Sequence, residues 1–444
     1  MLKLNAETLP ISRFRGGIYP RDNKERTAHK ASEKAPIPQK VWLPLIQNTG
    51  LPAKIIVSIG DKVKVGTKIA EAQGNISVPV HASISGKVTD ISEYNHPILP
   101  TRILTCVIES DQKDSWENNI KERDYNAFSN EELVTIIRDA GIVGLGGGAF
   151  PTHVKITPSL EKPIDTLIIN GCECEPYLTA DHRLMLEKSN EIAVGVKIIA
   201  KICDVKRIII AIENNKLDAI EMMKRTIPQN DGYSVIALKT SYPQGAEKQL
   251  IKTLLNRLVP AKGLPMDVGT LVHNVATCYA VYEACRFNKP LVERLITLTG
   301  SGIKEPKNLW VRLGTPLSDV VNFCNGYTEK PAKIIFGGPM MGITQYNDEM
   351  PITKGTSGVI VLTNKEIIIQ EEGPCIRCGR CIETCPMSLL PCEINNFVKK
   401  RDFAKAKSYN VLDCIECGSC AYGCPAKIKL VHAFKFAKNE IRLL

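Results

Sequence analysis

Short apolar runs alternate with turn residues along residues 41–110, for instance at 53–57, 68–72 and 86–91. Runs of this length at near-regular spacing are typical of strands in an all-β domain. We therefore expect residues 41–110 to form a small barrel or sandwich. The polar and basic residues 1–40 that precede them predict an extended arm.

Helical periodicity begins near residue 129, after this β-type region and a short linker. Ser129 and Glu132 have the spacing of a capping box. Four apolar residues then recur along one helix face: Leu133, Ile136, Ile137 and Ala140. Apolar runs at 165–170 and 207–213 predict buried strands with helical stretches between them. We expect residues 129–290 to form an α/β domain.

β-type runs return in residues 291–366, for instance at 295–299. Thr315 and Pro316 predict the start of a helix there, with threonine as the N-cap and proline as the first helical residue. Residues 111–128, which are charged and polar, predict the linker before the α/β domain.

The composition is that of a folded globular protein. The chain has 444 residues, of which 44% are hydrophobic and 23% are charged, which argues against a disordered, collagenous or coiled-coil protein. About three domains are expected at this length. No apolar run approaches the roughly 18 residues of a membrane span, and the first residues lack the apolar core of a signal peptide. We expect a cytoplasmic protein without a membrane span or export signal.

The net charge of +10 is unevenly distributed. Residues 1–40 hold nine Lys or Arg against four Asp or Glu, and residues 395–444 hold ten against four. Basic ends on a neutral body favour docking to an acidic partner or a lipid surface. Few aromatic residues lie among these basic ones, so we do not expect nucleic-acid binding.

Eight of the 16 cysteines form two copies of the pattern C-x2-C-x2-C-x3-C-P, which begin at Cys375 and Cys414. In this pattern the fourth cysteine of each copy binds the other cluster, so two [4Fe–4S] clusters are expected. The ligands expected for the first are Cys375, Cys378, Cys381 and Cys424. Those expected for the second are Cys414, Cys417, Cys420 and Cys385. Structural zinc is the alternative, but zinc ribbons use two paired C-x2-C units.

The cysteine repeat predicts a helical ferredoxin domain of residues 367–444, with one helical stretch over 395–407 between the two copies. Six cysteines outside the repeat have no ligand spacing, and we interpret them as small buried apolar residues: Cys106, Cys203, Cys278, Cys285, Cys324 and Cys392.

A glycine-rich loop follows the first predicted helix. Gly144, Gly146 and Ala149 have the spacing of a dinucleotide-binding fingerprint. A helix rather than a strand precedes the loop, and no helix is expected directly after it, so a simple turn is the alternative. Lys155 supplies a cation for an anionic ligand. The acidic segment 170–177 ends a predicted strand, and ligands of open α/β sheets bind at such ends.

Residues 141–155 together with 170–183, which read Asn-Gly-Cys-Glu-Cys-Glu-Pro-Tyr-Leu-Thr-Ala-Asp-His-Arg, resemble the C subunit of the Rnf-type ion-translocating oxidoreductase. They are more distantly similar to the flavoprotein subunit of respiratory NADH dehydrogenase. The resemblance covers nearly the whole chain. It includes the opening segment 14–20, a lipoyl-type barrel-sandwich, a β-grasp module of the SLBB type with Phe-Gly-Gly-Pro at 336–339, and the dicluster.

The resemblance implies sites for FMN and NAD(H), carried over by matching position. The flavin is expected at Gly144, Gly146, Gly147, Gly148, Lys155 and Asn170. Its phosphate is expected at Asn274 and Thr277. Phe150 is expected to stack on the nucleotide, Glu175 and Glu247 to line the NADH pocket, and Glu173 to be a further cofactor-binding residue. The chain departs from the family pattern at Arg15, Tyr19, Ala149, Cys172, Ala246 and His273.

The resemblance also implies the activity. A hydride passes between NAD(H) and FMN, and single electrons pass through the two clusters, so the cofactors supply the chemistry. No general base is needed, and we interpret His153 and His182 as structural. The protein is expected to lie peripherally on the cytoplasmic face of a membrane complex, beside its iron–sulfur and integral-membrane subunits. It would exchange electrons with ferredoxin through those subunits.

Two alternative functions are compatible with the sequence. A related NADH-dependent protein serving a cobalamin or amino-acid reductase shares much of this layout. A cluster-bearing electron adaptor with a vestigial nucleotide site is the alternative that is not an enzyme. The lipoyl-type barrel has no lysine at its hairpin tip, residues 73–75, so we expect no covalent cofactor and interpret the barrel as a docking scaffold.

Overall fold

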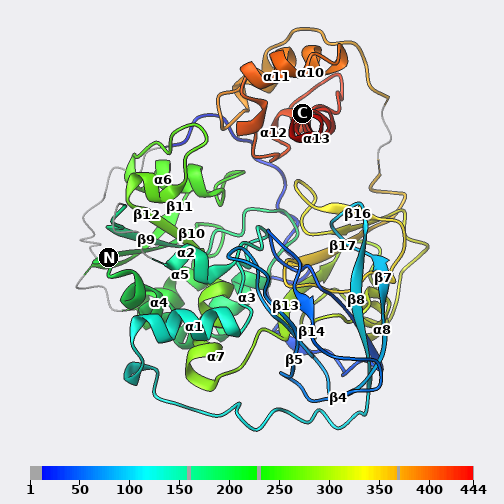
Figure 1. The fold of residues 1–444 in the computed structure, drawn as a ribbon. Coiled ribbons are helices and arrows are strands. Elements are labelled where there is room, and N and C mark those ends of the chain that lie inside the picture. Colours follow the sequence, from blue (N-terminus) through cyan, green and yellow to red (C-terminus); the bar gives the residue numbers. More distant parts are fainter. Residues whose placement is uncertain (1–12, 158–161, 228–231, 368–370, 444) are drawn as a thin grey trace. The chain divides into compact units, whose positions relative to one another are not determined.

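The computed structural model describes residues 13–157, 162–227, 232–367 and 371–443 (Figure 1). The chain forms two compact units, each assembled from separate segments. Unit 1 comprises residues 1–21, 239–272 and 368–444, and unit 2 comprises residues 22–238 and 273–367. No helix within the described parts of the chain is both long and apolar enough to cross a membrane.

The small β-domain that the sequence predicted after residue 40 is present in unit 2. Its two antiparallel sheets have the orders β2-β8-β7-β4 and β3-β5-β6. The strands are β2 (Lys40–Pro44), β3 (Lys54–Ile55), β4 (Lys62–Val63), β5 (Lys68–Glu71), β6 (Val80–His81), β7 (Gly86–Asn95) and β8 (Arg102–Ser110). Alternate residues such as Val41, Leu43 and Val88 are buried, which is why short alternating runs predicted them.

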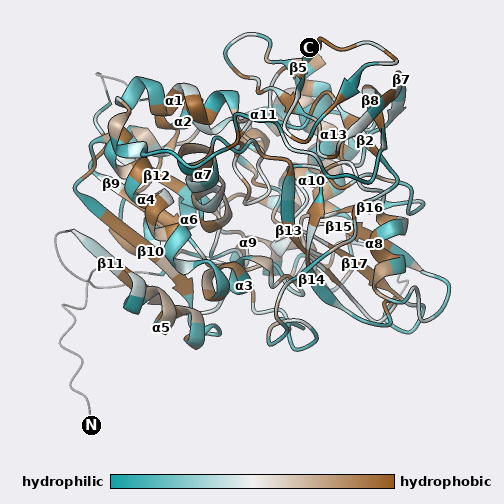
Figure 2. Cartoon of the chain, turned by 90° about the horizontal axis from the view of Figure 1, so that it is seen from below, coloured by the Kyte–Doolittle hydropathy of each residue, from teal (hydrophilic) through white to brown (hydrophobic). Residues whose placement is uncertain are grey.

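The α/β region is built on a sheet with the order β11-β10-β9-β12. The strands are β9 (Thr166–Asn170), β10 (Arg207–Glu213), β11 (Tyr233–Leu238) and β12 (Thr270–Asn274). Strand β10 pairs in parallel with β9 and β11. Because parallel strands are covered on both faces, β9 and β10 are apolar along their length, as the brown of β10 in Figure 2 shows. Both strands agree with the sequence prediction.

Helices surround this sheet. They are α1 (Asn130–Asp139), α2 (Thr152–Ile156), α3 (Ala180–Glu187), α4 (Ser189–Cys203), α5 (Leu217–Thr226) and α7 (Val275–Phe287), with a 3-10 turn at Tyr125–Ala127. The capping box predicted at Ser129 and Glu132 is present. Helices α4 and α7 approach closely because Gly195 has no side chain: a Cβ there would lie 1.8 Å from the Cys278 carbonyl oxygen.

The β-grasp-type region has the sheet order β1-β14-β13-β17-β15-β16. Its elements are β1 (Glu33–Lys34), β13 (Glu293–Thr299), β14 (Lys307–Arg312), α8 (Leu317–Phe323), β15 (Lys333–Phe336), β16 (Ile343–Gln345) and β17 (Gly358–Leu362). The predicted cap of α8 is wrong by one residue. Pro316 is the N-cap, and the Thr315 hydroxyl instead donates to the Arg312 carbonyl oxygen at 2.7 Å.

Residues 1–40 were expected to form an extended arm, and for residues 22–40 this is wrong, because they are part of the fold of unit 2. Residues 25–29 form turns, β1 pairs in parallel with β14, and Lys24 and Thr27 are buried. Residues 13–21 belong to unit 1, where Ile18 forms a β-bridge with Tyr242. Residues 1–12 lie outside the described residues.

Unit 1 is mainly helical. Its elements are α6 (Glu247–Leu255), a 3-10 turn at Pro265–Val268, α9 (Arg380–Glu383), α10 (Pro391–Lys399), α11 (Phe403–Ser408), a 3-10 turn at Val411–Asp413, α12 (Ser419–Tyr422) and α13 (Leu430–Leu443). The single helix expected over 395–407 is wrong. Arg401 has a left-handed φ of 56°, which ends α10, and the Asp402 side chain caps α11 by accepting from the Lys405 amide.

Candidate functional site

The glycine loop, residues 144–149, joins α1 to α2 in unit 2. Helix α2 begins at Thr152, directly after Pro151, so the expectation that no helix follows the loop is wrong. Five residues are too few for apolar periodicity to reveal a helix.

The loop is tied down at its ends and open along its middle. The Gly144 amide donates to the Phe150 carbonyl oxygen at 2.8 Å. Thr49 of the barrel donates its amide to the Ala149 carbonyl oxygen at 2.9 Å and its hydroxyl to that of Gly148 at 2.8 Å. A Cβ added at Gly147 or Gly148 would meet nothing within 4 Å. The loop therefore leaves space for a flat ligand over its backbone, while Phe150 beside it is half-buried.

Ala149, the last residue of the loop, has a φ of 45°. This left-handed conformation costs an L-residue about 1 kcal/mol. The two hydrogen bonds from Thr49 hold the loop in this conformation.

The start of α7 lies against the glycine loop. Asn274 caps the helix by accepting from the Ala276 amide at 2.9 Å, and its Nδ2 donates to Asp181 at 2.6 Å. The Thr277 hydroxyl accepts from the Leu145 amide at 2.9 Å. A Cβ on Gly146 would lie 3.3 Å from the Asn274 Cβ. The structure thus places two residues expected at the phosphate, Asn274 and Thr277, beside the loop and at a helix N-terminus, which attracts anions.

A buried polar group behind the loop was missed by the sequence reasoning. Arg294 donates to the carbonyl oxygens of Leu145 and Lys354. Lys354 Nζ donates to the carbonyl oxygens of Pro79 at 2.9 Å and Gly141 at 2.7 Å. Burial lowers the pKa of Lys354 to about 7. These contacts join distant segments, and no local pattern marks them.

Asp181 is a half-buried acid near Arg294 of this group. Burial and the nearby Glu173 raise its pKa to about 7, against the opposing effect of its hydrogen bond from Asn274. It belongs to the segment that carries the family resemblance, which was the only signal in the sequence that pointed to it.

Burial, with a smaller contribution from the charge of Lys155, lowers the pKa of the imidazole of His273, a residue of β12, well below its ordinary value. Among the residues that the structure describes, His273 Nε2 has no hydrogen-bond partner. A buried ring nitrogen without a partner fits a site completed by a ligand.

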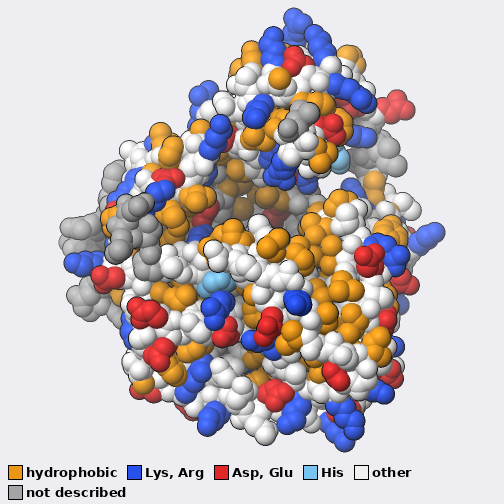
Figure 3. All heavy atoms as spheres, in the orientation of Figure 1, with side chains coloured by type: hydrophobic (Ala, Val, Ile, Leu, Met, Phe, Trp, Pro, Cys, Tyr) orange, Lys and Arg blue, Asp and Glu red, His pale blue; other side chains and the backbone are white. Residues whose placement is uncertain are grey.

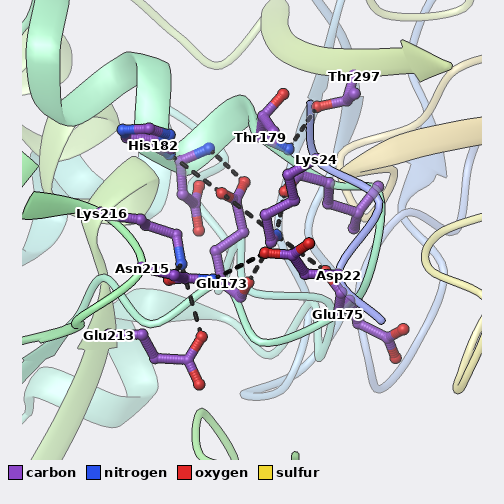
Figure 4. Close-up of polar contacts among 12 residues, drawn as sticks. Asp22, Lys24, Glu173, Glu175, Thr179, His182, Glu213, Asn215, Lys216 and Thr297 are labelled. Atoms are coloured by element: carbon purple, nitrogen blue, oxygen red, sulfur yellow. Dashed lines mark hydrogen bonds and ion pairs between the residues drawn. The ribbon is translucent and has the colours of Figure 1, made fainter. Parts of the chain in front are cut away.

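The acidic loop, residues 170–178, follows β9. The Asn170 side chain accepts from the Cys172 amide at 3.0 Å. The Glu173 carboxylate accepts from the amides of Asp181 at 2.7 Å and His182 at 3.3 Å, at the start of α3. Figure 4 shows this loop with its polar neighbours.

Glu175 is oriented by the β-grasp-type region. Its carboxylate accepts from the amides of Met340 at 3.1 Å and Met341 at 3.0 Å. A Cβ on Gly338 would lie 2.1 Å from Glu175 Oε2. The Phe-Gly-Gly-Pro sequence at 336–339 therefore provides the room that this carboxylate occupies.

The sequence also singled out Cys172, His182 and Glu247. Burial raises the pKa of Cys172 well above its ordinary value, so its thiol is not acidic. His182 Nε2 lies 2.7 Å from Asp218 Oδ1. Glu247, expected at the NADH pocket, is the first residue of α6 in unit 1, whereas the glycine loop belongs to unit 2.

In unit 1, the four cysteines expected at the first cluster line one cavity of about 300 Å³: Cys375, Cys378, Cys381 and Cys424. Cys375 and Cys378 are exposed. Cys392, which we expected to be a small buried apolar residue, is half-buried and lines the same cavity. Burial, and to a smaller extent the nearby Cys392, raises the pKa of Cys381 to about 12.

The four cysteines expected at the second cluster also lie together. Burial raises the pKa of Cys414 to about 11, and the charges of Cys417 and Cys385 act in the same direction. The Glu416 amide donates to Cys414 Sγ at 3.3 Å, and the Leu389 amide donates to Cys385 Sγ at 3.4 Å. Amide donors of this kind stabilise cluster thiolates. In the described residues, no three His, Cys, Asp or Glu side chains are placed to hold a single metal ion, so the assignment of the two clusters rests on the ligand spacing and on the grouping of the cysteines.

Four family models match the chain in order. They are the RnfC barrel sandwich hybrid domain over residues 12–113, the Nuo51 FMN-binding domain over 137–283, the SLBB domain over 295–344 and the 4Fe-4S dicluster domain over 367–425.

Curated relatives match nearly the full length. The chain is 49% identical over 434 residues to the C subunit of the proton-translocating ferredoxin:NAD+ oxidoreductase complex of Clostridium ljungdahlii, covering 97% of this chain and 94% of that protein. It is 42% identical to the Na+-translocating counterpart of Acetobacterium woodii, covering 96% and 97%. It is also 42% identical to the C subunit of the ion-translocating oxidoreductase complex of Rhodobacter capsulatus, covering 97% and 84%.

Among solved structures, an NAD+-reducing [NiFe]-hydrogenase in the H2-reduced state matches with 17% identity and a TM-score of 0.49, covering 70% of this chain and 63% of that one.

Proposed function

The chain belongs to the family of C subunits of ion-translocating ferredoxin:NAD+ oxidoreductase complexes, and from this membership we propose that it transfers electrons between NAD(H) and two [4Fe–4S] clusters through FMN. One observation supports this proposal above the others. A single chain combines a glycine loop that is open to a flat ligand with two groups of four cysteines. FMN exchanges electron pairs with NAD(H) and single electrons with clusters, so both kinds of site are needed.

For the flavin, we assign the glycine loop, Lys155 and Asn170 to the ring system. The N-terminus of α7, with Asn274 and Thr277, is assigned to the phosphate. The exposed Gly147 and Gly148 leave the backbone accessible, and a helix N-terminus favours an anionic group.

For the nicotinamide cofactor, we assign Phe150, Glu173, Glu175 and Glu247. The first is a half-buried ring beside the glycine loop. The carboxylates of Glu173 and Glu175 are each held by two backbone amides, so their positions are fixed before a nucleotide binds.

For the clusters, we assign Cys375, Cys378, Cys381 and Cys424 to one and Cys414, Cys417, Cys420 and Cys385 to the other. Each group combines three cysteines of one repeat with the fourth of the other, as the ferredoxin pattern requires.

Membership of this family associates the chain with a membrane complex. We place it peripherally on the cytoplasmic face, in contact with the iron–sulfur and integral-membrane subunits. Ferredoxin would exchange electrons with it through those subunits.

The proposal is tested with the full chain reconstituted with FMN, iron and sulfide under anaerobic conditions. Adding NADH should bleach the flavin absorbance, and removing NADH with an oxidising enzyme should stop the bleaching. A chain that binds FMN but leaves it oxidised in excess NADH would contradict the proposal.

A further inference from the structure

The acidic loop that carries Glu173 and Glu175 has a strained backbone. Glu173 has a φ of 47° and Tyr177 a φ of 70°, and neither is glycine. Each such residue costs on the order of 1 kcal/mol, and it persists only where its surroundings hold it in place. The contacts that hold this loop are therefore relevant to its function.

Lys24, from the segment before β1, provides the most direct of these contacts. Its Nζ donates to the carbonyl oxygens of Glu173 at 2.9 Å and Glu175 at 3.0 Å, and also to that of Leu178. It lies 4.0 Å from the Glu173 carboxylate, and its side chain is 8% exposed. An ammonium group has three donors, and all three bind backbone oxygens of this one loop (Figure 4).

Residues close to Lys24 in the sequence also contact the acidic loop and the residue after it. The Tyr177 amide donates to the Asp22 carbonyl oxygen at 2.7 Å. The hydroxyls of Thr27 and Thr179 lie 2.7 Å apart. Residues 22–27 therefore hold the loop along its length, and Lys24 binds the backbone on both sides of residue 174.

A buried lysine is costly unless its charge is compensated. Burial lowers the pKa of Lys24, while the charge of Glu173 raises it. An apolar side chain would fill this position at lower cost, so the lysine is explained by the groups that it binds. Those groups belong to the loop assigned to the cofactors.

A second buried lysine holds the start of the loop. Lys216 Nζ donates to the Cys172 carbonyl oxygen at 2.6 Å and lies 3.5 Å from Glu213 Oε2, with both side chains 1% exposed. Besides the loop, Lys216 contacts a carboxylate of its own segment. The carboxylate 4.0 Å from Lys24 instead belongs to the loop itself, at Glu173.

We propose that Lys24 is a positioning residue for the NAD(H)–FMN reaction. It fixes the backbone of residues 173–178 and thereby orients the carboxylates of Glu173 and Glu175 for cofactor binding. The inference rests on the proposed function, because it assumes that this loop binds the cofactors. It also gives the N-terminal segment a role in the nucleotide site that is separate from docking.

The test compares Lys24→Met with Lys30→Met in the full reconstituted chain. Lys30 is the matched control because it lies in the same segment but donates to the Pro306 carbonyl oxygen at 2.9 Å, away from the acidic loop. We measure the FMN dissociation constant, the KM and kcat for NADH, and amide hydrogen exchange of residues 173–182 without cofactors.

For Lys24→Met, we expect the FMN dissociation constant and the KM for NADH to rise at least tenfold, which corresponds to about 1.4 kcal/mol. The kcat should change less than the KM. Exchange should accelerate at Tyr177, Asp181 and His182, whose amides donate within this network. Lys24→Arg, which keeps the charge, should recover part of the affinity, and Lys30→Met should behave as the wild type.

Affinities within threefold of the wild type in Lys24→Met would overturn the inference, as would equal losses in Lys24→Met and Lys30→Met. If Lys24→Met does not fold, Lys24→Gln, which keeps an amide donor, is measured instead. Failure of the proposed function is distinguishable, because the wild-type chain itself would then fail to bind FMN or to reduce it with NADH.

Discussion

Gly148 is a position where the proposed flavin site can be tested with little effect on the fold. A Cβ there would meet no protein atom within 4 Å. Gly148→Ala should therefore leave the unfolding temperature of the cofactor-free chain unchanged while weakening FMN binding at least tenfold. Fluorescence titration with FMN measures the second effect. Gly373→Ala, in unit 1, is the control, because its nearest contacts would be ordinary ones at 3.8 and 4.0 Å, to Ala426. Unchanged FMN affinity in Gly148→Ala would place the flavin elsewhere.

Lys354 predicts a pH dependence of stability. Its pKa is about 7 in the folded chain, against an ordinary value of 10.5. Between these values the unfolded chain binds more protons than the folded one, so stability rises with pH. Relative to Lys354→Met, the wild type should gain about 1.4 kcal/mol of unfolding free energy per pH unit between pH 7 and 9.

Tryptophan fluorescence during urea unfolding measures the unfolding free energy of the wild type and of Lys354→Met for unit 2 alone. The three tryptophans, Trp42, Trp116 and Trp310, all belong to that unit. Parallel pH profiles of the wild type and Lys354→Met would show that Lys354 is not the group responsible.

At the scale of elements, the turn after β15 and the acidic loop fit together through Gly338. A Cβ at this position would overlap the Glu175 carboxylate. Gly338→Ala should lower the stability of unit 2 by about 1–3 kcal/mol, the usual effect of overpacking. It should also raise the KM for NADH, because Glu175 would lose the amides of Met340 and Met341. Wild-type stability and KM in this variant would show that the turn does not orient Glu175.

The two cysteine groups differ in exposure. Cys375 and Cys378 are exposed, whereas Cys385, Cys417 and Cys420 are buried. An iron chelator should therefore release iron from the reconstituted chain in two phases, with the first cluster lost faster. Cys375→Ser should remove the fast phase and leave the slow one. Cys392→Ser, which changes a thiol in the same cavity outside the repeat, should keep both. A single phase in the wild type would contradict this order.

The sequence predicted those elements whose signals lie within a few consecutive residues. The capping box of α1, the apolar strands β9 and β10 and the cysteine repeat were each visible within a few residues, because periodicity and ligand spacing are local properties. Helix α2 was too short to predict, and the break at Arg401 lies inside a run of basic residues that looks helical. The contacts of Lys24, Arg294 and Lys354 join segments far apart in sequence, so no local pattern reveals them.

At the scale of the whole molecule, some basic residues are exposed on the surface and others are buried in the fold. On the face drawn in Figure 3, basic side chains are interspersed with acidic ones, and basic ones gather at the top over α10 and α11. Residues 399, 400, 401, 405 and 407 there are all basic and exposed, which favours docking to an acidic surface. In the N-terminal segment, by contrast, Lys24 is buried and donates hydrogen bonds to the backbone of the acidic loop. The segment is therefore not only a docking arm.

The central claim is that one chain converts the electron pair of NADH into single electrons on its own clusters. It is tested most directly by anaerobic titration of the fully reconstituted chain with NADH, followed by both flavin absorbance and electron paramagnetic resonance. We predict that the flavin bleaches and that the signal of reduced [4Fe–4S] clusters then grows. In Cys414→Ser the flavin should still bleach while the cluster signal diminishes. A flavin reduced by NADH in a chain whose intact clusters stay oxidised, even at excess NADH, would contradict the account.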